Sequence, residues 1–138
     1  LAYEGHRDGH SQIIYKDLGD GERVISDRGG ALGDGNSHDP VIGNSGYYVA
    51  FESEAANLAV NALGRPGDFN GFADAYLYTD VRNLTLVQSV EEKAVPLAGG
   101  GQNPSMSYYA NYVLFDSPAP LGMGASASQI FMRYLGPV

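Results

Sequence analysis

The chain has 138 residues, a formal net charge of −8 and no cysteine. Its eight basic residues are too few and too scattered to neutralise a run of phosphates, which disfavours nucleic acids and anionic membranes as partners. The lack of cysteine excludes disulfides, thiolate catalysis and zinc–thiolate sites. The 19 glycines and ten tyrosines predict short strands joined by tight turns, and therefore an all-β fold.

Residues 1–37 contain three predicted strands, at 1–5, 12–18 and 22–26. These runs are rich in β-branched and aromatic residues and are bounded by glycine, serine or aspartate, as strands usually are. A turn signal, Gly19-Asp20-Gly21, separates the last two. We assign this stretch to an incomplete four-stranded unit whose first strand is missing.

Residues 38–102 contain a complete predicted unit of four strands. The first carries Asp39-Pro40, and the others are expected at 48–53, 74–81 and 84–89. A long loop, residues 54–73, separates the second strand from the third. Residues 103–138 begin in the same way, with Asn103-Pro104, but the predicted strands end with the third, at 129–135.

The last two units repeat each other with a constant spacing of 64 residues. The spacing aligns Asp39-Pro40 with Asn103-Pro104 and residues 48–53 (YVAFES) with residues 112–117 (YVLFDS). Residues 1–5 fit the same pattern as residues 49–53. Central strands with apolar residues on both faces need a neighbouring sheet on each side, so the repeat predicts stacked antiparallel sheets.

A proline (Pro40), then Tyr-Val-Ala-Phe-Glu-Ser (48–53), then Asp-x-Asn-Gly-x-x-Asp (68–74) and an aromatic strand form a pattern that resembles the WD40-like repeats of TolB-type bacterial propellers. The resemblance covers nearly the whole chain and implies a partial β-propeller of about two and a half four-stranded antiparallel blades. It also implies an exported bacterial protein, periplasmic or extracellular. Closed propellers use at least four blades. We therefore expect further blades from the same longer chain, from a partner chain or from other copies of this chain.

The segment Asp68-x-Asn70-Gly71-x-x-Asp74 is the best candidate for a metal site. Alternating Asp and Asn oxygens around a glycine turn are typical of the start of calcium loops. The same residues can instead cap a turn by accepting hydrogen bonds from nearby backbone amides. The sequence leaves both interpretations open, and calcium is the one cofactor it suggests.

Tyr108 and Tyr109 are the candidate partner-binding residues. Tyr48 and Tyr112 occupy equivalent repeat positions, which favours a packing role for those two, but Tyr108 and Tyr109 have no such explanation. Exposed tyrosines stack on sugars or anchor a protein partner. The sequence therefore predicts a protein or glycan ligand near this pair.

No catalytic constellation is evident in the sequence. Ser37-His38-Asp39 has the residue types of a triad, but adjacent strand residues point to opposite faces of a sheet. His6 and His10 lie in a loop pattern that does not direct both to one metal. We therefore expect a non-enzymatic binding or scaffolding propeller segment. The alternatives are the propeller portion of a larger enzyme of the peptidase or hydrolase type, with its catalytic residues outside this chain, or a calcium-stabilised structural module.

Overall fold

The computed structural model describes residues 1–59, 67–68, 70–79, 84–86, 100–118 and 128–134, with the backbone alone for 84–86. All regular structure in these ranges is β-strand, and no helix occurs among them. The strands form three antiparallel sheets and one short hairpin, and none of the sheets closes on itself. The predicted all-β class is confirmed.

The first sheet contains β1 (Ala2–Arg7), β2 (His10–Asp17) and β3 (Gly21–Val24), in chain order. Asp8 and Gly9 join β1 to β2 with φ angles of 49° and 88°, which suit a two-residue turn between twisted strands. A small hairpin of β4 (Asp27–Arg28) and β5 (Ala31–Leu32) follows. This hairpin was not predicted from the sequence, although Gly29-Gly30, both with positive φ, is a common turn signal.

The middle sheet contains β6 (Ser37–Ile42), β7 (Tyr48–Ser53), β8 (Asp74–Thr79) and β9 (Leu84–Leu86), again in chain order. The third sheet contains β10 (Gln102–Met106), β11 (Tyr112–Ser117) and β12 (Gln129–Tyr134). These strands lie in the segments where the repeat predicted them. Parts of the long loop (60–66 and 69), and the predicted strand ends at 80–81, 87–89 and 135, lie outside the described residues.

The middle and third sheets, which are related by the 64-residue repeat, also share an irregularity of the backbone. The register shifts between His38 and Val41 in the middle sheet and between Gln102 and Ser105 in the third sheet. Asp39 and Asn103, inside these two shifts, have almost the same positive φ, 51° and 50°. A β-bulge of this kind is a conserved way to redirect a strand within a repeat.

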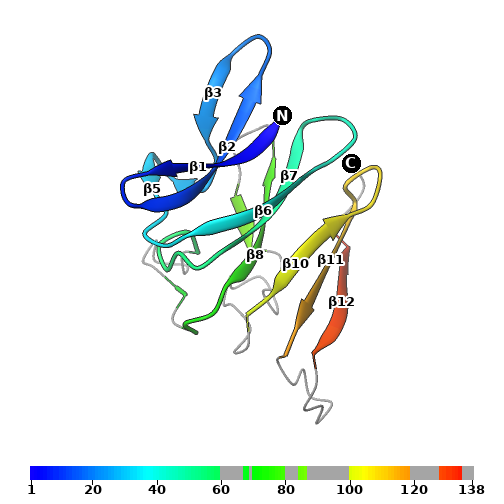
Figure 1. The fold of residues 1–138 in the computed structure, drawn as a ribbon. Helices are drawn as coiled ribbons and strands as arrows, with labels where there is room; N and C mark the ends of the chain where they lie inside the picture. Colours follow the sequence, from blue (N-terminus) through cyan, green and yellow to red (C-terminus); the bar gives the residue numbers. More distant parts are fainter. Residues whose placement is uncertain (60–66, 69, 80–83, 87–99, 119–127, 135–138) are drawn as a thin grey trace.

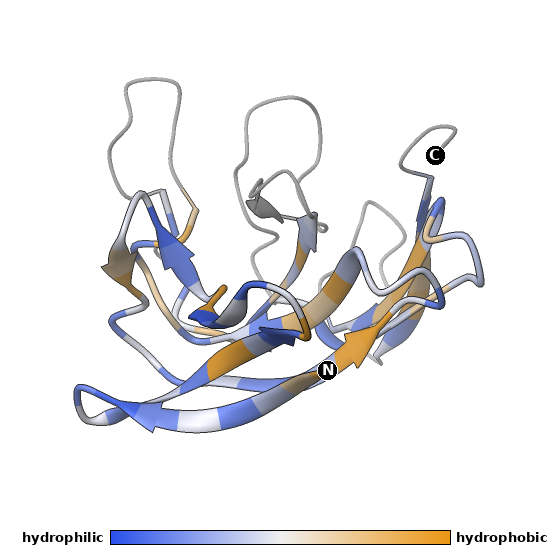
Figure 2. Cartoon of the chain, turned by 90° about the horizontal axis from the view of Figure 1, so that it is seen from above, coloured by the Kyte–Doolittle hydropathy of each residue, from blue (hydrophilic) through white to orange (hydrophobic). Residues whose placement is uncertain are grey.

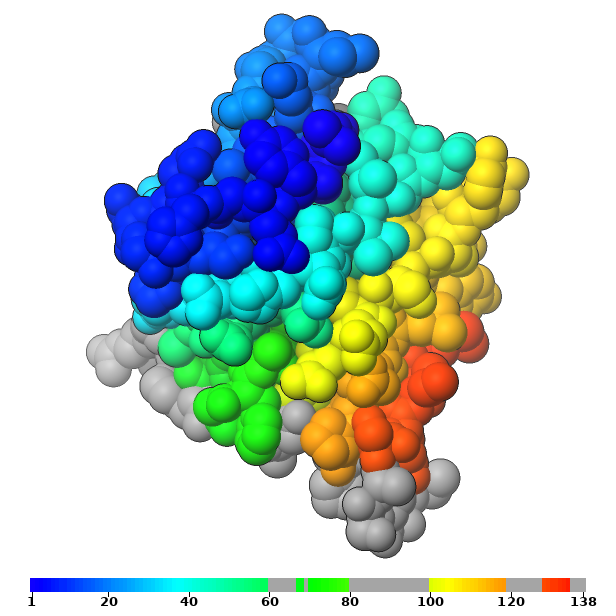
Figure 3. All heavy atoms as spheres, in the orientation of Figure 1, coloured from blue at the N-terminus to red at the C-terminus, as the bar shows by residue number. Residues whose placement is uncertain are grey.

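The three sheets lie side by side in chain order, as the colours of Figures 1 and 3 show. Strands β1 and β2 contact β6, and β10 contacts β6, β7 and β8. Hydrophobic segments lie mainly within the strands, while the hairpin turns at the rim are mostly hydrophilic (Figure 2). The chain therefore builds two buried layers, one on each side of the middle sheet.

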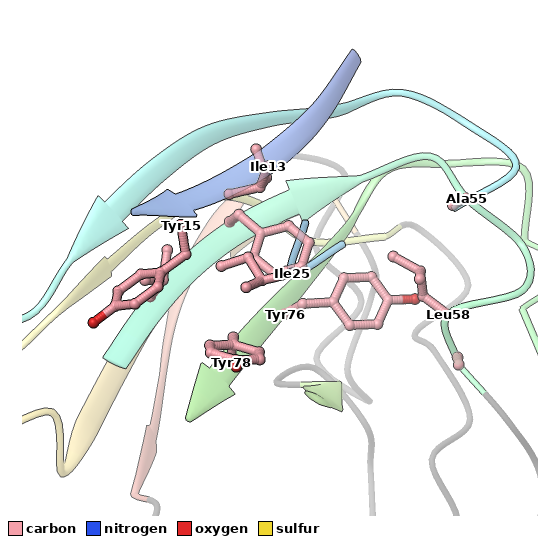
Figure 4. Packing of buried hydrophobic residues seen from close by; sticks show 10 residues of the cluster. Ile13, Tyr15, Ile25, Ala55, Leu58, Tyr76 and Tyr78 are labelled. Atoms are coloured by element: carbon pink, nitrogen blue, oxygen red, sulfur yellow. The ribbon is translucent and has the colours of Figure 1, made fainter. Parts of the chain in front are cut away.

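Strand β7 supplies both layers because its side chains alternate between the two faces. Val49 and Phe51 face the first sheet, whereas Ala50 faces the third. The layer against the first sheet also contains Ile13, Tyr15, Ile25, Ala55, Leu58, Ala59, Tyr76 and Tyr78 (Figure 4). The layer against the third sheet contains Ala75, Leu77, Val113 and Phe115, with Tyr48, Met106 and Phe131 at its margin.

We expect Gly35→Ala to destabilise the protein. A Cβ at this position would lie 2.7 Å from the carbonyl carbon and oxygen of Glu54 and 2.8 Å from the amide nitrogen of Ala55, and backbone cannot move aside cheaply. The overlap should cost about 1–3 kcal/mol of unfolding free energy, measured by urea denaturation. Gly19→Ala is the matched control, because a Cβ there meets nothing within 4 Å. Equal midpoints for the two variants would contradict this prediction.

Candidate binding site

Two equivalent turns of adjacent sheets form a cavity of about 470 Å³. One wall is the turn between β6 and β7, and the other is the turn between β10 and β11. The residues that line this tyrosine cavity are Asn44, Ser45, Tyr47, Tyr48, Tyr108, Tyr109 and Asn111. Its volume lies within the range of small-molecule sites, roughly 300–1,000 Å³.

The two turns share one hydrogen-bonding scheme. The Gly43 amide donates to the Tyr48 carbonyl at 2.8 Å, and the equivalent Ser107 amide donates to the Tyr112 carbonyl at 3.0 Å. In each turn the fourth residue then donates back to the first, at 2.9 Å in one and 2.8 Å in the other. These bonds fix both backbones, so the lining side chains project from rigid supports.

The first sheet braces the near wall of the cavity. The hydroxyl of Tyr15, which is itself buried, donates to the Gly46 carbonyl at 2.9 Å. In the far wall, the Ser107 hydroxyl donates to Asn111 Oδ1 at 2.8 Å and accepts from the Tyr112 amide at 3.2 Å. With its oxygen held in this way, Asn111 keeps its Nδ2 as the donor for a ligand.

Three of the tyrosines are unusually exposed for aromatic residues. Tyr47 is 54% exposed, Tyr108 64% and Tyr109 71%, and the rings of Tyr108 and Tyr109 meet edge to face at 4.9 Å. Tyr48 is half-buried and packs against the core layer next to the third sheet, as predicted from its repeat position. Tyr112, for which the same role was predicted, is half-buried against Tyr134 at a ring distance of 5.0 Å.

The lining residues carry no charged group, since they are all Tyr, Asn or Ser. Tyrosine rings offer flat apolar faces with a polar edge, and Asn and Ser offer both donors and acceptors. Such a surface suits a neutral ligand that has apolar faces and several hydroxyl or amide groups. Its nucleophilic and acidic groups are limited to the hydroxyls of Ser45 and the tyrosines.

The structure also brings the predicted calcium residues together. The Asn70 amide donates to Asp68 Oδ1 at 3.2 Å, and the Phe72 amide donates to Asn70 Oδ1 at 2.7 Å. Asn70 Nδ2 donates to Asp74 Oδ1 at 3.0 Å. These are turn-capping contacts, and they occupy the Asn70 oxygen that a cation would need.

The carboxyl groups of Asp68 and Asp74 are both buried in this segment. Burial raises the pKa of Asp74 to about 8, a hydrogen bond shared with Asp68 adds to the rise, and the Asn70 amide opposes it. The Asp74 carboxyl is therefore largely protonated at neutral pH when no cation is present. A bound calcium ion would instead favour the ionised form of Asp74. Calcium binding at this segment stays a prediction.

No group of three or more His, Asp or Glu side chains that could hold a metal ion occurs within the described ranges. Ser37 is buried and its hydroxyl donates to Ser53 Oγ at 2.8 Å, whereas His38 lies 3.5 Å from Glu4. The side chains of Ser37 and His38 therefore contact different residues, as predicted from their adjacent positions on one strand.

Of the lining residues, only Tyr108 and Tyr109 were predicted from the sequence as binding residues; Tyr48 was assigned to packing, and Tyr47, Asn44, Ser45 and Asn111 were missed. A signal for them was present, because the 64-residue spacing aligns Asn44 and Ser45 with Tyr108 and Tyr109, and Tyr47 with Asn111. Each turn therefore contributes polar residues where the other contributes rings.

The chain matches no protein-family model, and no curated protein was found to match it. The part of the chain that the structure describes contains no helix long and apolar enough to cross a bilayer.

Proposed function

We propose that the chain is a segment of a β-propeller, about two and a half blades long, that acts as a non-enzymatic binding module. The blade interpretation is supported by three meandering antiparallel sheets that stack face to face in chain order. The shared bulges at Asp39 and Asn103 add to it, because they mark equivalent strands of successive units. The resemblance to WD40-like, TolB-type repeats and the export that it implies belong to the same proposal.

The ligand that we propose is a neutral glycan held in the tyrosine cavity. The observation that carries this is the meeting of exposed Tyr47, Tyr108 and Tyr109 with uncharged amide and hydroxyl groups in one concave site. A pyranose has an apolar face that stacks on an aromatic ring and hydroxyls that bind amides. The net charge of −8 disfavours acidic polymers in the same place.

We expect Tyr109→Ala to weaken glycan binding about two- to twelvefold, because loss of one exposed stacking contact removes about 0.5–1.5 kcal/mol. Tyr109 is the most exposed ring of the cavity. A neutral-oligosaccharide array identifies the glycan for the intact chain, and isothermal titration calorimetry then measures the dissociation constants.

Tyr134→Ala is the matched control, because Tyr134 is 55% exposed but does not line the cavity. It should leave affinity unchanged. Asn111→Ala should weaken binding while the fold, followed by circular dichroism, stays the same. Absence of binding to any neutral glycan, or equal losses for Tyr109→Ala and Tyr134→Ala, would refute the proposed site.

A further inference from the structure

The third sheet has an exposed apolar face on the side away from the middle sheet. In β12, Phe131 packs toward the middle sheet, while Ile130, Met132 and Tyr134 are 78%, 65% and 55% exposed. The residues paired with them on β11 are Asp116, Leu114 and Tyr112. We call these six residues the open face. Three large exposed hydrophobic residues on one strand are typical of an interaction surface.

The positions of the open face are covered in the two preceding sheets. Leu114 is equivalent to Ala50, which is fully buried between the middle and third sheets. Strand pairing likewise places Met132 opposite Leu114, as it places Leu77 opposite Ala50. The open face therefore continues an interface that this chain already makes twice.

An acidic side chain joins the sheets at each of those two interfaces. Glu4 of the first sheet accepts a hydrogen bond from the Asp39 amide of the middle sheet at 3.1 Å. Glu52 of the middle sheet accepts one from the Asn103 amide of the third sheet at 3.0 Å. Both donors belong to the bulged Asp/Asn-Pro step, where positive φ leaves the amide outside the normal strand ladder.

The hydrogen bond from the bulge amide affects the pKa of both Glu4 and Glu52. The hydrogen bond from the Asp39 amide is the main reason why the pKa of Glu4 is lowered. Burial raises the pKa of Glu52, and the hydrogen bond from the Asn103 amide opposes that rise. In both cases the bulge amide stabilises the carboxylate form, as charge-assisted hydrogen bonds do.

Asp116 is the third member of this series and lies on the open face. It occupies the repeat position of Glu52, 64 residues further along the chain. Its oxygens accept from Asn103 Nδ2 at 2.8 Å within its own sheet and from the Ser128 hydroxyl at 3.2 Å. A carboxylate has about four acceptor sites, so Asp116 can also accept a bulge amide from a following sheet.

We propose that the open face binds a further antiparallel sheet of the same repeat, one whose first strand carries an Asp/Asn-Pro bulge, and that Asp116 accepts the amide of that bulge. The partner's apolar side chains would take the places that Val113, Phe115 and Phe131 hold against the middle sheet. The inference extends the proposed stacking of blades, but it does not depend on the glycan ligand.

A second copy of the described chain does not fit this requirement. Its two Asp/Asn-Pro amides already donate to Glu4 and Glu52 within the chain. A copy could cover the apolar residues but could not supply a bulge amide to Asp116. The partner sheet must therefore carry an Asp/Asn-Pro step of its own.

The test extends the chain by one repeat, joining Tyr134 to a second copy of residues 80–138. This copy supplies a fourth strand for the third sheet and a new sheet with its own Asn103-Pro104 step. Because the chain contains no cysteine, Met132→Cys in the original part places one thiol on the open face. We expect maleimide to label the M132C thiol at least about tenfold more slowly in the extended chain than in the original chain.

Leu18→Cys is the control, because Leu18 is fully exposed in the turn between β2 and β3. It should label at the same rate in both chains. Equal labelling of the M132C variant in both chains overturns the proposal, including the case in which the added unit does not fold onto the chain. Protection in the original chain that grows with protein concentration, together with a dimer mass, also overturns it in favour of self-association.

The role of Asp116 is tested by Asp116→Ala in both chains. Its contacts to Asn103 and Ser128 are lost in each, whereas the contact to a bulge amide is lost only in the extended chain. We expect a larger fall in melting temperature in the extended chain. Equal falls would exclude Asp116 from the interface.

Discussion

Phe51→Ala is expected to lower the free energy of unfolding by about 3–5 kcal/mol, since it removes a large side chain from a fully buried site. Phe51 is 0% exposed and its ring stacks on that of Tyr76 at a centroid distance of 5.7 Å. The two rings lie in the layer that joins the first sheet to the middle sheet. Neighbouring strands are held by backbone ladders and cannot close in on the cavity that is left.

Urea denaturation and thermal melting measure the effect, which should amount to roughly 10–25 °C in melting temperature. Phe72→Ala is the matched control, because Phe72 is 50% exposed. A surface truncation of this kind usually changes stability by less than about 0.5 kcal/mol. Similar losses for the two phenylalanines would show that the first and middle sheets do not share a core.

Asp74→Asn is expected to stabilise the protein at pH 8, by an amount on the order of a few kcal/mol. The Asp74 side chain is fully buried, and its pKa is raised from 3.8 to about 8, first by burial and then by the hydrogen bond with Asp68. An asparagine has nearly the same shape and stays uncharged at every pH. It therefore removes the cost of burying a carboxylate.

The direction of the pH dependence follows from proton binding. Between about pH 4 and pH 8 the folded chain holds a proton on Asp74 that the unfolded chain has released. The stability that this carboxyl contributes is thus complete below its unfolded pKa and is lost as pH rises through its folded pKa. Wild-type stability should fall over that window relative to the D74N variant, and the two should converge near pH 4.

Urea denaturation at pH 4, 6 and 8 measures this difference, and Asp20→Asn at an exposed turn position is the control. A constant gap between wild type and the D74N variant across the series would contradict the prediction. Calcium binding would have the opposite effect on the relative stability of the two proteins at pH 8. If Asp68 and Asp74 held the ion, millimolar calcium would stabilise the wild type at pH 8 and the D74N variant would lose that gain.

The strand pattern was accessible from the sequence because it depends on local chemistry. Runs of β-branched and aromatic residues bounded by turn residues form strands wherever a sheet can cover them. The 64-residue spacing likewise identifies Glu52 and Asp116 as equivalent positions of the repeat. The hairpin of β4 and β5 was not predicted, because its strands are only two residues long and show no alternating pattern of their own. Its turn depends on Gly29 and Gly30.

The sequence alone determined the all-β class, the positions of the longer strands, the repeat and the exposed tyrosine pair, since each follows from residue type and spacing along the chain. Only the tertiary structure decided which surfaces meet. It placed the turns of two different sheets around one cavity and set Glu4 and Glu52 against the bulge amides of Asp39 and Asn103. It also left Ile130 and Met132 exposed. These features join residues far apart in the chain, and such contacts are fixed by how sheets pack rather than by the preferences of any one strand.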